Sequence, residues 1–150
     1  MAEKIVRVKF AKLSDEAIEP NQGSQHAAGW DLRALEQTTV HKGSSTRIRT
    51  GLAVAIPRGW EGQIRSRSSL GAKGMIMPNG VGTIDADYRG ELQVLATWIG
   101  EGDCITLNKG ERIAQLLIAP VPTVEFVETT VEGLGETERG EGGFGSSGKF

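Results

Sequence analysis

The chain has 150 residues with 17 basic and 19 acidic side chains, which give a net charge of −2. This length suits a single domain with one core, and the charge balance excludes the basic surface that binding to duplex nucleic acid requires. No apolar run is long enough to span a bilayer and no basic-apolar leader opens the sequence, so we expect a cytoplasmic protein with neither a membrane nor a nucleic acid as partner.

The single cysteine, Cys104, cannot form an internal disulfide. A reducing compartment is therefore expected, with Cys104 as a small buried residue rather than a nucleophile. Two histidines and one cysteine allow no zinc site of known spacing. The 21 glycines, about twice the usual frequency of roughly 7%, have no Gly-x-y period and indicate tight turns between short strands.

Apolar alternation predicts short strands through the first half of the chain. Residues 6–10 alternate valine and phenylalanine with arginine and lysine, and a later short strand carries Asp31. The clearest strand is 47–56, where every second residue from Ile48 to Ile56 falls on one face. A Pro-Arg-Gly turn then leads into a strand over 60–65, so this pair is predicted to form a hairpin.

A polar segment, 65–74, follows this predicted hairpin. Ser68 or Ser69 is expected to cap one short helical turn that Gly74 ends. The unpaired N–H groups of a helix start, beside hydroxyls and Arg67, suit an anion. An ordinary capped turn explains the same residues.

Residues 79–92 form the centre of the predicted organisation. They read as two short strands folded back on each other, with Asp85, Asp87 and Tyr88 at the mouth of a glycine-rich hairpin. Such a hairpin can grip a flat ring with its own backbone groups, while a carboxylate beside it polarises a water. The plain alternative is a surface turn with solvated acids.

The strand predicted from Leu92 to Ile99 is apolar on both faces, which predicts burial on both sides. Further strands are expected over 105–107, 112–118 and 124–127. Arg112 and Gln115 interrupt an apolar strand, and a buried polar side chain needs a partner, either the backbone or a ligand.

The character of the sequence changes at Gly133. Residues 133–150 are glycine-rich and polar, too poor in apolar surface to hold a fixed shape alone. They are either a disordered tail or an arm that orders over a ligand, with Arg139 on anionic oxygens, Phe144 on a ring and a Gly-Ser-Ser-Gly run around phosphate.

Five of these segments, in order and across nearly the whole chain, resemble the five motifs of the trimeric dUTP nucleotidohydrolases, the dUTPases. They are AGWDL at 28–32, RSSL at 67–70, GTIDADYRG at 82–90, GERIAQ at 110–115 and RGEGGFGSSG at 139–148. The one departure is Trp30, where the family more often has tyrosine; it bears on local packing rather than on the neighbouring acid.

The resemblance implies an all-β, jelly-roll-like distorted barrel over 1–132 and a flexible C-terminal arm over 133–150. It implies a homotrimer with shared active sites. The implied reaction is hydrolysis of dUTP to dUMP and pyrophosphate by attack of water on the α-phosphorus, which limits uracil entry into DNA and supplies dUMP for dTMP synthesis. The implied cofactor is Mg²⁺.

The resemblance also assigns roles to individual residues. Asp85 matches the catalytic base, and Asp31 matches the acid that receives the waters of Mg²⁺. Tyr88 matches the ring that packs on the deoxyribose. The remaining substrate-binding candidates are Arg67, Ser68, Ser69 and Gln115 for the inner phosphates; Arg139, Gly145, Ser146 and Ser147 for the outer ones; Asn79, Thr83, Ile84 and Gln93 for the base and sugar; and Phe144 as a cover over the uracil.

Two other readings remain at this stage. A dCTP deaminase would share the fold and use a glutamate as its base, and Glu91 is the nearest glutamate. A dUTPase-like module without activity is the second reading. Ammonia from dCTP, or pyrophosphate from dUTP, would distinguish the first reading, and absence of pyrophosphate release would favour the second.

Overall fold

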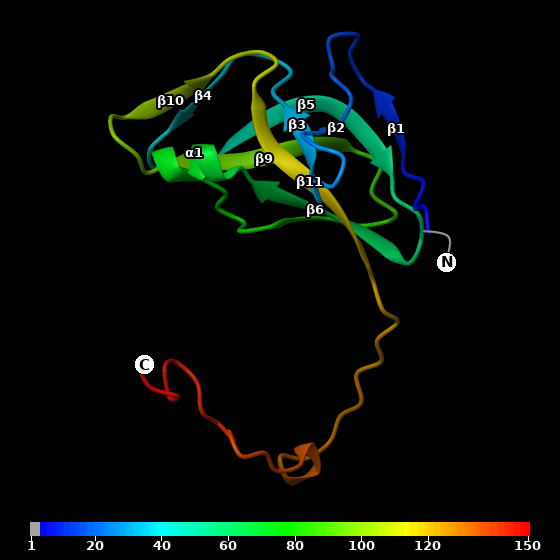
Figure 1. Cartoon of the computed structure of the whole chain (residues 1–150), viewed down its shortest axis with the longest axis vertical. Helices are drawn as coiled ribbons and strands as arrows, with labels where there is room; N and C mark the ends of the chain where they lie inside the picture. Colours follow the sequence, from blue (N-terminus) through cyan, green and yellow to red (C-terminus); the bar gives the residue numbers. More distant parts are fainter. Residues whose placement is uncertain (1–3) are drawn as a thin grey trace.

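The computed structural model describes residues 4–150 and is built almost entirely of strands (Figure 1). The strands are β1 (Lys9–Lys12), β2 (Asn21–Gln22), β3 (Trp30–Arg33), β4 (Thr38–His41), β5 (Thr46–Ala55), β6 (Trp60–Ser66), β7 (Met75–Ile76), β8 (Gly82–Ile84), β9 (Glu91–Trp98), β10 (Cys104–Leu107) and β11 (Arg112–Pro120). One α-helix, α1 (Ser68–Lys73), and one 3₁₀ helix, η1 (Glu132–Leu134), complete the described residues.

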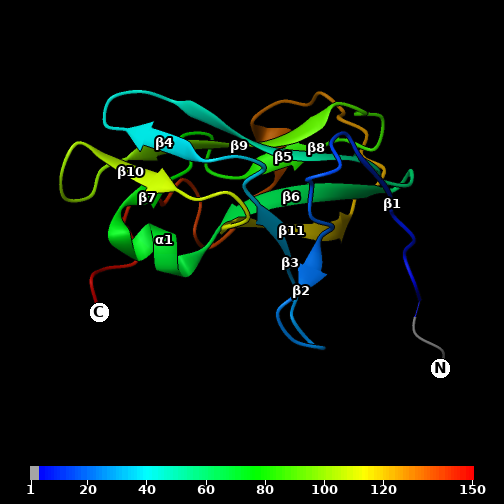
Figure 2. The same cartoon turned by 90° about the horizontal axis from the view of Figure 1, so that it is seen from above.

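The strands form two antiparallel sheets and a two-stranded ribbon. One sheet has the order β1-β5-β9-β7, the other has the order β2-β3-β11-β6-β8, and β10 pairs with β4. Figure 2 shows the two larger sheets stacked over one another. The prediction of an all-β, jelly-roll-like distorted barrel is confirmed.

The core lies between the two sheets and comes from alternate residues of their strands. In β5, Ile48 and Leu52 are fully buried, as the alternation in 47–56 predicts, and Leu92 and Val94 of the neighbouring strand β9 are fully buried as well. No helix within residues 4–150 has the length and apolar character needed to cross a membrane.

The predicted hairpin between β5 and β6 is wrong. β5 pairs with β1 and β9, whereas β6 pairs with β11 and β8 in the other sheet. A Cβ placed on Gly62 of β6 would lie 2.7 Å from Cδ1 of Ile56, just beyond the end of β5. The two strands therefore stack across the core, because the turn at 57–59 carries the chain from one sheet to the other.

Residues 79–92 also supply two strands that do not pair with each other. β8 is hydrogen-bonded to β6, and β9 is hydrogen-bonded to β5 and β7. The predicted narrow hairpin is therefore wrong in its pairing, although the predicted turn between the strands is present. β8 is the last strand of its sheet, so its outer backbone edge has no strand partner among residues 4–150.

Three smaller predictions also need correction. Cys104 is exposed at the start of β10, in a ribbon of only two strands that cannot bury it. Ser68 does not cap α1: the N-cap is Arg67, without a side-chain cap, although Gly74 ends the helix in the left-handed conformation as expected. β9 is fully buried on one face only, and its second face is half-buried.

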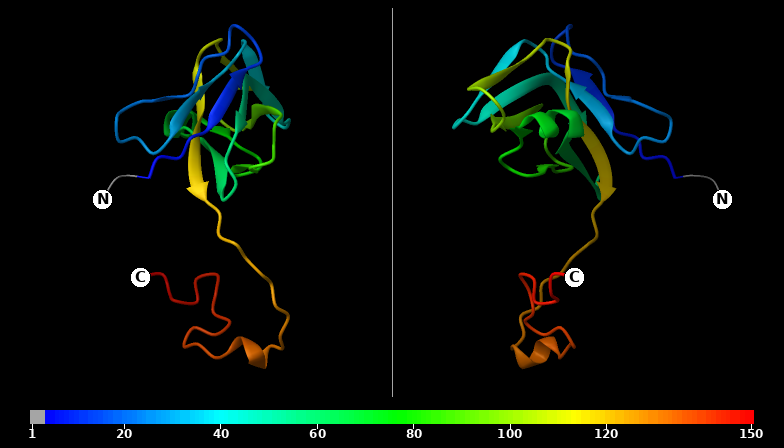
Figure 3. Two further views of the ribbon diagram at one scale, coloured as in Figure 1. Left: turned by 90° about the vertical axis from the view of Figure 1, so that its right-hand side faces the viewer. Right: turned by 60° about the vertical axis from the view of Figure 1, so that its left-hand side comes forward.

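The chain leaves the barrel after Pro120 and runs away from it (Figures 1 and 3). The strand predicted over 124–127 does not form, because this segment has no strand beside it; Phe126 is 97% exposed. Beyond η1, residues 135–150 form a series of turns that lie apart from the barrel in the same views. The division of the chain at residue 133 stays a prediction.

Candidate active site

A hollow of about 260 Å³ lies between β8 and β9, where the two strands separate into different sheets. Six of the residues predicted from the sequence line it together: Asn79, Thr83, Ile84, Asp85, Tyr88 and Gln93. Arg47, Ile64, Gly82, Glu91 and Leu95 complete its lining. Because β8 and β9 do not pair with each other, a space remains between them that paired strands would fill.

Asp85 begins the turn that closes one end of this hollow. The N–H of Tyr88 donates to the carbonyl of Asp85 at 3.1 Å, and the Arg89 guanidinium donates to the carbonyl of Ala86 at 2.6 Å. Asp87, two residues on, lines a different hollow together with four basic residues: Arg7, Lys9, Arg58 and Arg89. The turn therefore directs its two carboxylates to separate places.

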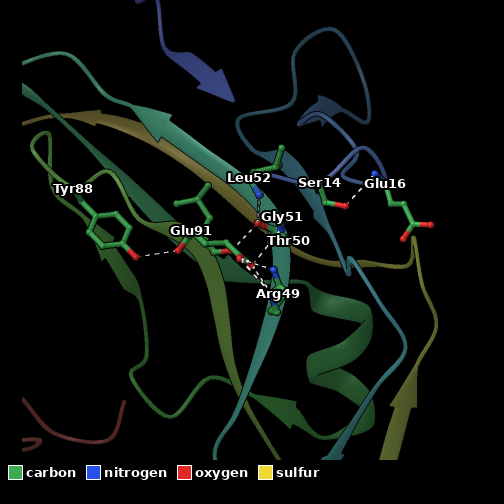
Figure 4. Close-up of polar contacts among 9 residues, drawn as sticks. Ser14, Glu16, Arg49, Thr50, Gly51, Leu52, Tyr88 and Glu91 are labelled. Carbon is green, nitrogen blue, oxygen red and sulfur yellow. Dashed lines mark hydrogen bonds and ion pairs between the residues drawn. The ribbon is translucent and has the colours of Figure 1, made fainter. Parts of the chain in front are cut away.

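The Tyr88 ring packs against the backbone of Gly90. A Cβ at position 90 would overlap the ring, so only glycine leaves room for the ring in this position. The Tyr88 hydroxyl donates to the carbonyl of Glu91 at 3.0 Å (Figure 4). One edge of the hollow is therefore an aromatic ring that packs on Gly90 and is hydrogen-bonded through its hydroxyl.

Glu91 and Arg49 form an ion pair beside Tyr88 (Figure 4). Nη2 of Arg49 lies 3.1 Å from Oε1 of Glu91, and Nε lies 3.2 Å from Oε2. The hydrogen bond to Glu91, with its negative charge, raises the pKa of Arg49 above its ordinary value. The Glu91 side chain is 14% exposed, so most of this carboxylate is turned to its partners.

A second group of predicted residues gathers where β3, β11, β6 and α1 meet. The Gln115 amide donates from Nε2 to the carbonyl of Ser66 at 3.1 Å, and a Cβ on Gly29 would overlap its carbonyl oxygen. Arg67 donates from Nη1 to the carbonyl of Arg112 at 3.1 Å. The polar residue predicted to need a partner inside β11 therefore has one in the backbone.

Asp31 stands beside Gln115, its register partner across β3 and β11. Oδ2 of Asp31 lies 3.6 Å from Nη1 of Arg112. Within residues 4–150, no three His, Cys, Asp or Glu side chains are grouped so that they could hold a metal ion. The donor set fits a hydrated cation approached by one carboxylate, and it does not fit a cation enclosed by protein ligands.

The third group lies in the C-terminal segment. Arg139, Gly145, Ser146 and Ser147 line one hollow there, and Arg139 donates from Nε to the carbonyl of Gly142 at 2.7 Å. Phe144 is fully exposed. Within a single chain the structure does not bring these residues to Asp85, because their segment lies away from the barrel (Figure 3).

Sequence reasoning missed several residues that shape the hollow between β8 and β9. Arg47, Arg49 and Glu91 were given no role in it, although Glu91 was noted as a glutamate near Asp85. The local pattern holds no signal for these contacts, since Arg49 and Glu91 are 42 positions apart. Gly29 and Gly90 lie within recognised motifs, but their steric role, to leave room for Gln115 and Tyr88, follows only from the packing.

Comparison with known proteins places these features in a family. The family model described as dUTPase matches residues 15–148. Deoxyuridine 5'-triphosphate nucleotidohydrolases from Nautilia profundicola and Syntrophotalea carbinolica are 46% and 47% identical over 145 and 148 residues, covering 96% and 97% of this chain and 100% and 99% of the relatives.

Solved structures agree in fold. A mutant dUTPase of Staphylococcus bacteriophage 80alpha, solved with dUpNHpp, has a TM-score of 0.76 at 30% identity and covers 95% of this chain and 99% of that chain. A mutant dUTPase from phage phi11 of S. aureus has a TM-score of 0.73 at 24% identity, covering 82% of this chain and 96% of that chain; it is described with a structural Mg(II) ion.

Proposed function

The chain belongs to the dUTPase family, and we propose that its Asp85 is the base for the hydrolysis of dUTP in the hollow between β8 and β9. The reaction converts dUTP to dUMP and pyrophosphate. The observation that carries the proposal is the joint lining of one hollow by Asp85, Tyr88 and the free edge of β8.

The free edge of β8 suits recognition of uracil. Backbone N–H and C=O groups over 79–84, with the Asn79 amide, have the alternating donors and acceptors that pair with the polar edge of uracil. Cytosine presents the opposite pattern and would leave buried groups unpaired, which costs affinity. Thymine adds a methyl group that the Gly82 backbone and Ile84 leave little space for.

The remaining contacts in the hollow concern the sugar. Tyr88 presents its ring to the deoxyribose, and a 2′-hydroxyl would collide with it. Gln93, Thr83 and Ile84 complete the lining around the nucleoside. Specificity for dUTP therefore rests on the backbone for the base and on one ring for the sugar.

Asp85 orients the attacking water and accepts its proton as oxygen bonds to the α-phosphorus and pyrophosphate leaves. Asp85 is exposed in the single chain, so the site needs a cover that excludes bulk water. Phe144, itself fully exposed, is the aromatic residue of the C-terminal segment proposed for this task.

The triphosphate is anionic and needs donors along its length. Arg67, Ser68, Ser69 and Gln115 are proposed for the inner phosphates, with Arg139, Gly145, Ser146 and Ser147 for the outer ones. Bound Mg²⁺ would offset phosphate charge, with Asp31 as the carboxylate that receives its waters. This set does not overlap the residues that contact the base.

The C-terminal group of predicted residues lies away from the barrel that carries the other two groups, which supports a trimer in which neighbouring subunits complete each site. The exposed segment 121–131, with Phe126 and Val131 in solvent, suits an arm that covers a neighbour. A cytoplasmic location is part of the same proposal.

A dCTP deaminase using Glu91 as base fits less well. The Glu91 carboxylate already accepts three hydrogen bonds from Arg49 and one from the Gly51 N–H, so it is not free to take a proton from water. Ammonia released from dCTP would favour the deaminase, and pyrophosphate released from dUTP favours the hydrolase.

Asp85→Asn tests the assignment of the base, with Asp87→Asn as a matched control in the same turn. Because an amide cannot accept the proton, we expect Asp85→Asn to lower kcat by roughly 10²- to 10⁴-fold while dUpNHpp still binds. Asp87 lines the other hollow, so Asp87→Asn is expected to keep kcat. Full pyrophosphate release by Asp85→Asn would show that another residue is the base.

A further inference from the structure

A bulge in β5 lies directly beside the start of β9. The register of the two strands runs without interruption to Arg49 opposite Gln93 and then jumps to Ala53 opposite Glu91. Within the bulge, Thr50 donates from Oγ1 to the carbonyl of Leu92 at 2.6 Å and is 1% exposed. A buried side chain therefore holds the bulge to β9 where the regular ladder is interrupted.

The carboxylate of Glu91 is held by the same bulge (Figure 4). It accepts the paired Nε and Nη2 donors of Arg49, and Oε2 also accepts the backbone N–H of Gly51 at 3.3 Å. Gly51 has φ of +71°, and a Cβ there would lie 2.9 Å from Leu35, so the backbone of the bulge packs closely against this side chain. Glu91, the first residue of β9, is thus held in place through its side chain.

Glu91 also holds the active-site tyrosine, but through its backbone. Its carbonyl accepts the Tyr88 hydroxyl at 3.0 Å, while Gly90 leaves room for the ring. We propose that Arg49 and Glu91 are positioning residues that fix the Tyr88 ring and thereby set the preference for deoxyribose over ribose. This inference rests on the proposed function, which places the sugar against Tyr88.

The reason is geometric. A ring excludes a 2′-hydroxyl only if it cannot withdraw by a fraction of an ångström, and one net hydrogen bond is a modest restraint unless its acceptor is itself fixed. Here the acceptor belongs to a residue whose side chain is bound to a bulge that Thr50 ties to β9. Loosening Glu91 lets the ring withdraw and admits the larger sugar.

The test compares kcat and KM for dUTP and UTP in Arg49→Met, Glu91→Ala, Tyr88→Phe and the double variant Arg49→Met/Tyr88→Phe. Arg49→Lys serves as a milder variant that keeps the charge and loses the paired donors. Lys109→Met is the matched control, because it removes the cation of another exposed ion pair, Lys109 with Glu16, at 2.7 Å. Thermal unfolding of each variant identifies those with altered folding.

We expect Arg49→Met, Glu91→Ala and Tyr88→Phe each to lower the preference for dUTP over UTP by roughly five- to tenfold, mainly through a lower KM for UTP. The double variant should lower this preference no more than the stronger of its two single variants does, because both substitutions break the same connection between Arg49 and Tyr88. The preference of Arg49→Lys should lie between that of Arg49→Met and that of the unmodified chain, and Lys109→Met should keep the full preference.

If the Arg49 and Glu91 variants lose kcat equally for dUTP and UTP and keep the preference, the inference is wrong. The Arg49–Glu91 pair would then have a structural role only. Tyr88→Ala separates the role of the Arg49–Glu91 pair from that of the tyrosine ring. If Tyr88→Ala abolishes the preference while Arg49→Met, Arg49→Lys and Glu91→Ala keep it, the inference is wrong and the role of Tyr88 stands. If Tyr88→Ala keeps the preference, the proposed contact between ring and sugar is itself wrong.

Discussion

At the scale of single residues, Gly90 shows how an absent side chain can shape a site. A Cβ at this position would overlap the Tyr88 ring, whose hydroxyl is tied to Glu91. We expect Gly90→Ala to displace the ring and lower kcat/KM for dUTP by about tenfold, a smaller loss than that of Asp85→Asn because the proposed base is untouched.

The control for this variant is Gly90→Ala placed in a Tyr88→Ala background. Without the ring there is nothing to displace, so the added methyl group should have little further effect on kcat/KM. A second loss of similar size in that background would show that Gly90 acts on the backbone and not through Tyr88.

Residue types in the turn were predictable from the sequence, but their partners were not. Asp85 and Tyr88 lie within a contiguous motif, so local spacing identifies them. Arg49 and Glu91 meet only because β5 and β9 are neighbours in a sheet, and nothing within either segment indicates the other. Steric roles such as that of Gly29 depend likewise on a side chain, Gln115, far along the chain.

At the scale of elements, the stacking of β5 over β6 depends on Gly62. A Cβ there would lie 2.7 Å from Ile56, just beyond the end of β5, and 3.1 and 3.2 Å from Ile84 and Leu116 in the sheet of β6 itself. We expect Gly62→Ala to overpack this contact and lower the free energy of unfolding by about 1–3 kcal/mol in urea denaturation.

Gly71→Ala provides the comparison, since a Cβ there would meet nothing within 4 Å and the residue lies inside α1. It should leave stability unchanged or raise it by up to about 1 kcal/mol, because alanine favours a helix more than glycine does. Equal stability of the Gly62 and Gly71 variants would contradict the close stacking of the two sheets.

The sequence predicted most strands correctly and their pairing incorrectly, for a physical reason. Alternation reports which face of a strand is buried, and the alternation in β5 does so correctly. A turn such as Pro57–Gly59 allows its two strands either to pair within a sheet or to stack across a core, and the turn residues are the same in both cases. The choice depends on which strands compete for each edge, a property of the whole fold.

At the scale of the whole molecule, the residues of the C-terminal segment proposed to bind phosphate lie away from the barrel that carries Asp85. Deleting residues 140–150 is expected to leave a folded trimer with far weaker turnover, because it removes the proposed contacts to the outer phosphates without touching the core. Size-exclusion chromatography and pyrophosphate release measure the two effects. A truncated chain that fails to fold, or that cleaves dUTP at the full rate, would contradict the role given to the arm.

Sharing of sites between subunits has a separate test. Co-expressing the truncated chain with Asp85→Asn should yield mixed trimers in which an intact Asp85 meets an arm from another subunit. We expect activity well above that of either chain alone. Activity equal to the sum of the separate chains would mean that each arm serves its own barrel.

The outermost features of the chain were the hardest to predict from the sequence. The apolar pattern at 124–127 is typical of a strand, yet in a single chain Val124 and Phe126 are exposed and unpaired. A sequence shows that such residues favour contact with another surface, but it does not show whether that surface belongs to the same chain. Cys104 is a similar case, since its residue type favours burial and its ribbon offers none.

The proposed function requires uracil to bind the free edge of β8 while Asp85 faces the α-phosphorus. A crystal structure with dUpNHpp would show both contacts at once. We predict that the uracil is hydrogen-bonded to the backbone of residues 79–84, with the Tyr88 ring on the deoxyribose and a water between Asp85 and the α-phosphorus. A nucleotide bound with its base elsewhere, or with Asp85 remote from that phosphorus, would contradict the account.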